Sequence, residues 1–384
     1  MTMTYPLPSS TDQIADLHLS TASRGAELNL VHGGAVDPAD IIFGCGPIVT
    51  DRSGPIELTQ VDAAVHAALE AGVVHFDTAP LYGDSEDRLG HALAASPLGS
   101  SAVVMTKAGK VIRRLCPLRH VASLGPEPWT PFAIPLEERC LLPDYTAAGA
   151  RKSYTESCQR MGLSSLHTLR IHDADSIEGA FAAATAPDGL IAGLMQLKAE
   201  GAIQHVSLGM NANIDHKVVT PGTGGLETTA WQPDDILRVI RASPEGCFDS
   251  ALLAYSWSLF SQDGWPVLQE CAARGIEVHI AGIWAGLHHV NAGSVRANTT
   301  HDATTKKMDR WRTLAAGHGC SVEAVAVAFA ALPSVVGKVV MGMKSAEEVA
   351  TNVAAAAEAA TVPSRIWAQA QAQGLLPAHL PLPA

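Results

Sequence analysis

Four side chains able to transfer a proton follow apolar runs that could be neighbouring strands. Asp77, Lys107 and His172 each stand at the end of such a run, and Tyr82 follows Asp77 by five residues. If the runs are parallel strands, their carboxyl ends meet at one rim. We therefore predict that these four residues converge on one catalytic site.

The four residue types suit acid/base chemistry at oxygen. A lysine at a buried strand end is costly unless it is paired, and Asp77 is the obvious partner for Lys107. The ammonium would favour the phenolate form of Tyr82 and lower a pKa that is about 10 in model peptides. Tyr82 could then act as a general acid or base. His172 would donate a hydrogen bond to a carbonyl or alkoxide oxygen.

Each residue also has a purely structural interpretation. Asp77 could cap the next turn, and Tyr82 could be a packed loop aromatic. His172 could be a satisfied histidine of the core or rim, and Lys107 could extend its ammonium to solvent. Their arrival at the ends of three successive strands favours the catalytic interpretation.

The elements that must position these residues alternate between strands and helices. Eight short apolar runs are predicted to be strands: 41–43, 73–76, 102–105, 168–171, 203–208, 251–253, 277–281 and 338–340. Helical spacing occurs between them, at 61–71, 87–95, 150–161, 190–200, 233–241, 265–274 and 346–359.

Glycines mark the joints between helices and strands. Gly72, Gly162, Gly201 and Gly275 each follow a predicted helix and precede a strand, as a left-handed helix end requires. Eight strands in such units predict an α/β fold, specifically a closed (β/α)8 TIM barrel. An open sheet is less consistent, because the segment after the first strand, Gly44 to Val49, is not G-x-G-x-x-G.

The domain organisation follows from the same reading. We predict an N-terminal arm at residues 1–37 and a single barrel domain at 38–384. Two connections, 110–143 and 282–304, are long loops at the C-terminal face, where barrel enzymes bind substrate.

Composition excludes several other classes. The 384 residues carry 26 Lys+Arg against 38 Asp+Glu, a formal net charge of −12, and no basic block, so a nucleic acid is not an expected partner. No run approaches the roughly 18 apolar residues of a membrane span. The seven dispersed cysteines and the absence of a targeting pattern in residues 1–37 indicate a cytoplasmic protein.

The segment around Asp77 resembles the aldo-keto reductase signature. The matching residues are Phe76-Asp77-Thr78-Ala79, Tyr82-Gly83, Ser85-Glu86, Leu89-Gly90 and Leu93. The resemblance implies a catalytic tetrad of Asp77, Tyr82, Lys107 and His172 and the same eight-stranded barrel.

Further cues resemble the aldose 1-dehydrogenase branch of that superfamily, which includes pyridoxal 4-dehydrogenase. They are Asp144-Tyr145 with Gly149 and Ser153, the run Ile171 to Asp175, and Gly209-Met210-Asn211. This implies an NAD(P)-dependent oxidoreductase that oxidises an aldose at C1 to a lactone. The alternatives are an NADPH-dependent aldehyde or ketone reductase, a pyridoxal dehydrogenase, and a nucleotide-sensing subunit without turnover. A non-enzymatic helical repeat protein is a third alternative, and the eight predicted strands argue against it.

The resemblance also implies residues for a nicotinamide cofactor. Asn211 would bind the carboxamide, Trp257 would stack on the nicotinamide ring, and Gly286-Leu287 would lie near the pyrophosphate. Trp257 could instead plug the barrel, and Asn211 could be a turn residue.

A helix start after the last strand could bind the adenosine end of the cofactor. The implied residues are Gly342, Lys344, Ser345, Glu348 and Asn352. Exposed helix amides and a lysine suit an anion, although a serine-capped helix with an incidental lysine would look the same. Many relatives carry Arg near this point, so the choice between NAD and NADP stays open.

No metal site is predicted. His288-His289 are adjacent, and no third ligand follows at a useful spacing.

Overall fold

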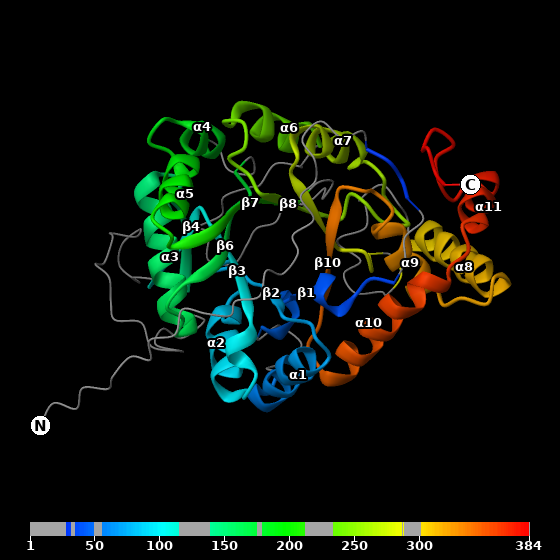
Figure 1. The fold of residues 1–384 in the computed structure, drawn as a ribbon, viewed down its shortest axis with the longest axis horizontal. Coiled ribbons are helices and arrows are strands. Elements are labelled where there is room, and N and C mark those ends of the chain that lie inside the picture. The colour runs from blue at the N-terminus through cyan, green and yellow to red at the C-terminus, as the bar shows by residue number, and fades with distance from the viewer. Residues whose placement is uncertain are drawn as a thin grey trace, which may run out of the picture.

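The computed structural model describes residues 28–31, 35–49, 56–114, 139–174, 179–211, 233–285, 287 and 301–383. Eight parallel strands close into a barrel in the order β1-β10-β9-β8-β7-β6-β3-β2 (Figure 1). The strands are β1 Ile41–Gly44, β2 His75–Asp77, β3 Val103–Ala108, β6 Leu166–His172, β7 Ile203–Asn211, β8 Ser250–Ala254, β9 Glu277–Ala281 and β10 Val336–Gly342. All eight predicted strands and the predicted barrel are confirmed.

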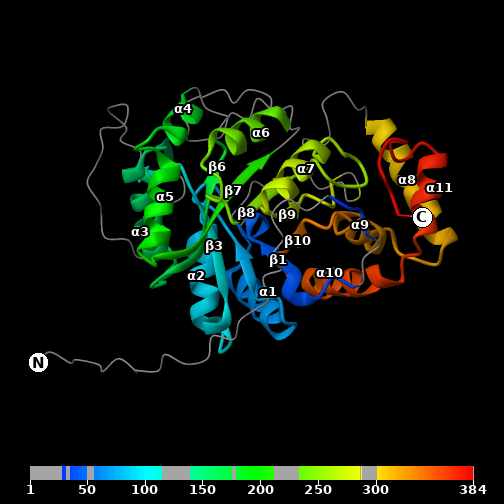
Figure 2. The ribbon, with the colours of Figure 1, turned by 45° about the horizontal axis from the view of Figure 1, so that its top comes forward.

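Helices surround the barrel, as the two views show (Figures 1 and 2). Seven of them match the predicted ones: α1 Leu58–Glu70, α2 Ser85–Ala95, α3 Ala147–Met161, α5 Leu190–Ala199, α6 Pro233–Ala242, α7 Trp265–Arg274 and α10 Ala346–Glu358. The sequence analysis missed α4 Ala180–Thr185, α8 His301–Gly317, α9 Val322–Ala330 and α11 Arg365–Ala372. Short 3-10 turns lie at Pro38–Asp40, Gly46–Ile48, Gly99–Ser101 and Ala359–Thr361.

The glycine joints have the backbone conformation that the sequence predicts. The φ angles are 85° at Gly72, 66° at Gly162, 75° at Gly201 and 65° at Gly275. These left-handed angles favour glycine over residues with a Cβ. Each one turns the chain from a helix into the next strand.

No single helix in the described ranges is long and apolar enough to cross a membrane. The helical segments 304–317 and 322–330 would together be long and apolar enough, but the chain bends by 97° between them.

The long connection after β3 contains two further strands. Strands β4 Lys110–Arg114 and β5 Arg139–Pro143 pair antiparallel. The prediction of a long loop throughout 110–143 is therefore wrong at both ends, because the β-branched and apolar residues there pair with each other. Residues 115–138 lie outside the described residues. The second predicted loop ends earlier than expected, since α8 begins at His301.

Part of the predicted N-terminal arm packs on the barrel. Leu30 forms a bridge with Pro333 and is only 8% exposed, and the Val31 amide donates to the Leu332 carbonyl. Residues 1–27 and 32–34 lie outside the described part of the chain, so the division at residue 37 stays a prediction.

Two kinds of side chain fill the barrel interior. Strands β1, β8 and β10 contribute an apolar side, which consists of Ile42, Leu252, Ala254 and Val340, and these pack with Met105 of β3. Strands β2, β3 and β6 contribute a charged side, which consists of Asp77, Lys107, Arg170 and His172. The charged side holds the predicted catalytic residues.

Candidate active site

The structure brings the four predicted catalytic residues together. The Lys107 ammonium lies 2.5 Å from Asp77 Oδ1, and it also donates to the Thr78 carbonyl oxygen at 2.8 Å. The same nitrogen lies 4.6 Å from the centroid of the Tyr82 ring. The rings of Tyr82 and His172 meet edge to face with centroids 6.1 Å apart.

Burial and charge set the ionisation of the Asp77–Lys107 pair. Burial would raise the pKa of Asp77, but Lys107 and Arg170 hold this pKa below its ordinary value. Burial would lower the pKa of Lys107, but the neighbouring Asp77 carboxylate keeps it above its ordinary value. Both groups are therefore charged at neutral pH, in the state that hydrogen bonding between them requires.

The expected lowering of the Tyr82 pKa is not found. Lys107 does act to lower it, but burial and the carboxylate of Asp77 outweigh that effect, and the pKa of Tyr82 lies above 10. The prediction was wrong because it weighed the ammonium without the desolvation of the phenol. In this structure Tyr82 holds its proton at neutral pH, which is the form a general acid needs.

His172 is a neutral imidazole at the rim. Burial lowers the pKa of His172 to about 3. Its Nε2 lies 3.3 Å from a carboxylate oxygen of Asp173, and that carboxylate accepts a hydrogen bond from Lys110 at 2.8 Å. The Tyr145 hydroxyl donates to the backbone carbonyls of His172 and Asp173, at 2.5 and 3.0 Å. These contacts fix the end of β6, where Asp173 has a φ of 54°.

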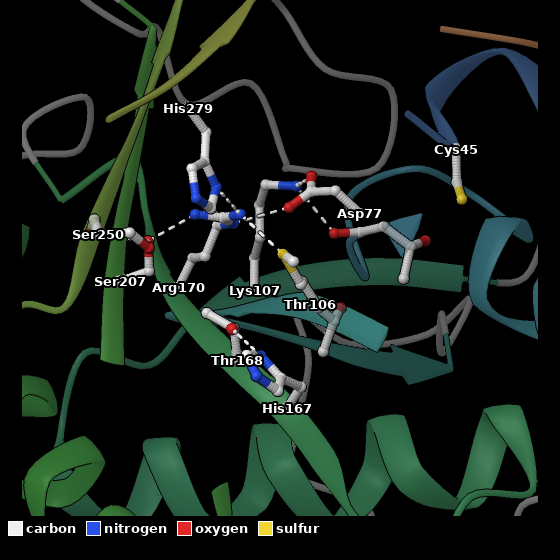
Figure 3. A network of polar contacts seen from close by, with 12 residues as sticks. Cys45, Asp77, Thr106, Lys107, His167, Thr168, Arg170, Ser207, Ser250 and His279 are labelled. Atoms are coloured by element: carbon white, nitrogen blue, oxygen red, sulfur yellow. Dashed lines mark hydrogen bonds and ion pairs between the residues drawn. The ribbon is translucent and has the colours of Figure 1, made fainter. Parts of the chain in front are cut away.

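Arg170 is a charged member of this site that the sequence analysis missed. Its side chain is 0% exposed and its Nε lies 2.7 Å from Asp77 Oδ2 (Figure 3). A signal was available. Arg170 precedes His172 by two residues in a strand, so both side chains face the barrel interior, and an arginine inside an apolar run needs a buried partner.

Trp257 does not occupy the predicted position against a nicotinamide ring. Its side chain is 0% exposed, its ring stacks with Trp265 and Phe329 at centroid distances of 5.7 and 4.9 Å, and its indole N–H donates to the Phe329 carbonyl. This prediction is corrected: Trp257 packs in the core, because its apolar ring finds partners on α7 and α9.

Tyr255 is the aromatic residue that follows β8 at the barrel mouth. Its φ is 60°, an unusual backbone angle for a residue with a side chain. Its ring lies so close to Gly282 that a Cβ there would be 2.5 Å from Tyr255 Cδ1. The glycine thus leaves room for the ring. Tyr255, not Trp257, is the partly exposed aromatic of this strand end.

The start of α10 forms a closed cap. The Ser345 hydroxyl accepts from the Glu348 amide at 3.2 Å, and the Glu348 carboxylate accepts from the Lys344 amide at 2.9 Å. The Lys344 side chain is exposed, and its carbonyl accepts a hydrogen bond from Gln60. This reciprocal cap places a negative charge where the sequence analysis expected a free anion site.

The other predicted cofactor residues have varied positions. Asn211 ends β7 beside Ala254, and its side chain lies outside the described part, as does all of Gly286. Leu287 is 1% exposed and its amide donates to the Trp284 carbonyl. Gly342 is exposed at the end of β10, and Asn352 is buried on α10.

Within the described ranges, no three histidine, cysteine, aspartate or glutamate side chains lie together as metal ligands. His288 and His289 fall outside those ranges.

The arrangement suits proton transfer to or from one oxygen. Tyr82 offers a protonated phenol beside a fixed ammonium, and His172 offers a neutral imidazole at the same rim. A carbonyl or hydroxyl oxygen between them could be oriented by His172 and exchange its proton with Tyr82. An ion pair of Asp77 and Lys107 at 2.5 Å keeps the charge beside that phenol fixed.

The comparison with protein families agrees with the fold and this geometry. The family model described as "Aldo/keto reductase family" matches residues 40–232, which is half of the chain. The protein belongs to the aldo/keto reductase family and is an oxidoreductase.

Two curated proteins are similar to this chain along most of its length. D-threo-aldose 1-dehydrogenase from Pseudomonas sp is 28% identical over 323 residues, covering 82% of this chain and 88% of its own. Pyridoxal 4-dehydrogenase from Microbacterium luteolum is 26% identical over 347 residues, covering 84% and 90%.

Solved structures share the fold. A glycerol dehydrogenase from Gluconobacter oxydans matches with a TM-score of 0.60 and 18% identity, covering 90% of this chain and 93% of its own. An aldo-keto reductase from Bacillus halodurans, in its holo form, matches with a TM-score of 0.58 and 20% identity, covering 89% and 93%.

Proposed function

We propose that this oxidoreductase oxidises an aldose at C1 to the lactone with a nicotinamide dinucleotide. The observation that carries the proposal is the Lys107 ammonium held 2.5 Å from Asp77 and 4.6 Å from the Tyr82 ring. Support for the aldose comes from the relative named D-threo-aldose 1-dehydrogenase.

In the proposed oxidation, Tyr82 acts as the general base. His172 donates a hydrogen bond to the C1 oxygen of the cyclic sugar and orients it. At alkaline pH, where Tyr82 with its raised pKa loses its own proton, the phenolate takes the proton of the C1 hydroxyl as the C1–H bond breaks and the C1=O bond of the lactone forms. When bound, the oxidised nicotinamide supplies the acceptor for the hydride. In the reverse direction Tyr82 returns its proton as a general acid.

Two features of the barrel mouth support binding of such a dinucleotide. At the barrel mouth, His172 Nδ1 is a buried ring nitrogen with no hydrogen-bond partner among the described residues, so the rim keeps polar capacity for a ligand. Tyr255 is a partly exposed aromatic ring near the same rim. Asn211, Gly286 and Leu287 would complete the nicotinamide and pyrophosphate end of the site.

The cap of α10 favours NAD over NADP. The Glu348 carboxylate at the helix start can accept hydrogen bonds from ribose hydroxyls, and it would repel a 2′-phosphate. Lys344, Ser345, Gly342 and Asn352 would form the rest of this adenosine end. We therefore propose NAD as the preferred cofactor.

A panel assay tests the reaction. Absorbance of reduced nicotinamide is followed while the protein receives NAD or NADP with L-fucose, L-galactose, D-arabinose and pyridoxal. Reduction of NAD with one aldose supports the proposal. Turnover of pyridoxal alone would move the assignment to the activity of the second relative. No cofactor reduction with any of these compounds, together with NADPH oxidation by simple aldehydes, would show a reductase instead.

The variant Glu348→Gln tests the cofactor preference. It keeps a side-chain acceptor for the Lys344 amide and removes the negative charge. We expect the ratio of kcat/KM for NAD to that for NADP to fall by about tenfold, the effect of roughly 1.4 kcal/mol. Glu347→Gln, an exposed neighbour on the same helix, is the matched control. An equal change in both variants would contradict a specific role for Glu348.

A further inference from the structure

We propose that Arg170 is a positioning residue that biases Tyr82 towards phenolate, because it adds a second cation to the buried Asp77–Lys107 pair. The inference rests on the proposed function, in which Tyr82 serves as the base. Arg170 reaches the reacting atoms only through Asp77 and Lys107.

The geometry divides one carboxylate between two cations. Asp77 Oδ1 lies 2.5 Å from the Lys107 ammonium, while Oδ2 lies 2.7 Å from Arg170 Nε. The side chains of the three residues are at most 4% exposed. Because water does not screen them, the sum of their charges acts on the nearby phenol.

That sum is one positive charge. Asp77 contributes −1, and Lys107 and Arg170 contribute +1 each. Without Arg170, the pair would be neutral, and the carboxylate would cancel much of the field of Lys107 at Tyr82. Arg170 binds the second oxygen of that carboxylate and offsets its charge, so more of the effect of Lys107 on the Tyr82 ring is retained.

The other partners of Arg170 are neutral. Its Nη1 donates to Ser207 Oγ at 2.6 Å, and its Nη2 lies 2.9 Å from Met105 Sδ and 2.8 Å from His279 Nδ1 (Figure 3). Burial, and then Arg170 itself, keeps the pKa of His279 well below 6.5. His279 therefore accepts from Arg170 with Nδ1.

The remaining proton of the His279 ring follows from this bond. With Nδ1 as acceptor, the proton resides on Nε2, which donates to Glu277 Oε1 at 2.9 Å. The guanidinium is thus held from three directions by Asp77, Ser207 and His279. It cannot leave Asp77 without giving up buried hydrogen bonds.

Other titratable groups surround the cluster on every side. At the mouth, Asp173 pairs with Lys110 at 2.8 Å, and the Asp173 carboxylate acts to raise the pKa of Tyr82. Burial raises the pKa of Cys45 well above its ordinary value, so it is a neutral thiol. At the far end of the network, Glu277 faces Lys338 and His205. These groups leave the excess positive charge beside Asp77.

The experiment is the pH profile of kcat/KM for the oxidation, with Arg170→Gln compared with Arg170→Lys. Activity falls on the acidic side as Tyr82 becomes protonated. Arg170→Gln keeps a donor for Asp77 and loses the charge, so we expect the acidic limb to move up by about one pH unit. Arg170→Lys keeps the charge and loses the forked geometry. We expect its limb to stay within about 0.3 unit of wild type.

Ser207→Ala is the matched control, since it removes a hydrogen bond to Arg170 and no charge. Its limb stays in place under the proposal. A purely structural role would lower thermal stability in all three variants and leave every limb unmoved, and that result overturns the proposal. An equal upward shift in the Gln and Lys variants overturns it as well.

Two further measurements distinguish a failure of the Arg170 proposal from misfolding of a variant and from a failure of the proposed function. Arg170→Met is the second neutral variant if Arg170→Gln does not fold, and the same upward shift is expected. Wild-type protein that oxidises no aldose contradicts the proposed function. In that case, the acidic limb of the pyridoxal reaction, or the basic limb of the reduction reaction, gives the same test of Arg170.

Discussion

The two sides of the barrel interior are built from strands of the same sheet but differ in the chemistry of their side chains. On the apolar side, Ile42, Leu252, Ala254 and Val340 form a small cluster with Met105. On the charged side, four ionisable side chains are held by hydrogen bonds and ion pairs. Both sides are buried, so exposure alone does not tell them apart.

The two sides differ in how much they contribute to the stability of the fold. Burial of the apolar side adds free energy of folding at about 25 cal/mol per Å². A buried ion pair contributes little net stability, because the cost of desolvation offsets the attraction. The charged side therefore adds little to stability, and in the proposed function its charges act on Tyr82 and His172. The apolar side contributes to the stability of the barrel that holds it.

The largest expected effect is at Tyr82, whose ring lies 4.6 Å from the Lys107 ammonium of the charged side. Tyr82→Phe removes the only proposed acid/base group and keeps the ring, so we expect kcat to fall by about 10²–10⁴-fold. Dinucleotide affinity should stay within a few fold, measured by fluorescence titration. Near-full activity of this variant would remove the acid/base assignment.

An intermediate effect is expected on the apolar side. Ile42→Ala leaves a cavity at a fully buried position, and we expect the free energy of unfolding to drop by about 2–4 kcal/mol. Denaturant titration measures this loss. Ile42 is apolar and is not one of the proposed catalytic residues, so kcat at a temperature well below unfolding should change by less than about threefold. A large loss of kcat in folded protein would show that the two sides are not separate.

The smallest effect concerns the histidines of the interior. Burial lowers the pKa of both His75 and His172 to about 3, whereas the unfolded chain titrates near 6.5. The fold keeps them neutral, so stability is full above pH 6.5 and is lost as pH falls towards 3. Each residue accounts for at most about 2 kcal/mol of that loss at pH 5.

Thermal unfolding between pH 7 and pH 4.5 measures this dependence. In His75→Leu, the loss of stability between pH 7 and pH 4.5 should be smaller by the contribution of one histidine. An unchanged slope in that variant would show that His75 titrates normally in the folded protein. Ile42→Ala, which lowers stability without changing any titratable group, should keep the wild-type slope.

Much of the fold could be predicted from the sequence because its signals are local. Apolar runs of strand length, helical spacing and glycines at the joints predicted all eight barrel strands. The hairpin of β4 and β5 was missed, since its two strands are separated by 24 residues and neither has an alternating pattern. Helices α8 and α11 were missed although Gly319 and Gly374, with left-handed φ angles, follow them. No glycine directly follows α9.

The site shows the same limit more sharply. Asp77, Lys107 and His172 could be predicted because each follows an apolar run of strand length within one or two residues. Arg170 was missed, since its partners Asp77 and His279 are 93 and 109 residues away. Trp257 was misplaced, because a position after a strand does not reveal whether a ring faces the mouth or packs against helices.

The sequence by itself determined the barrel, the family and the four residues that meet at its rim, because strand length, helix spacing and the order of strand ends follow from neighbouring residues. Only the tertiary structure decided the ionisation and the partners of those residues. Desolvation raised the pKa of Tyr82, a second cation joined Asp77, and Glu348 closed the start of α10. These depend on how deeply a group is buried and which charges surround it in three dimensions, and no local pattern encodes either one.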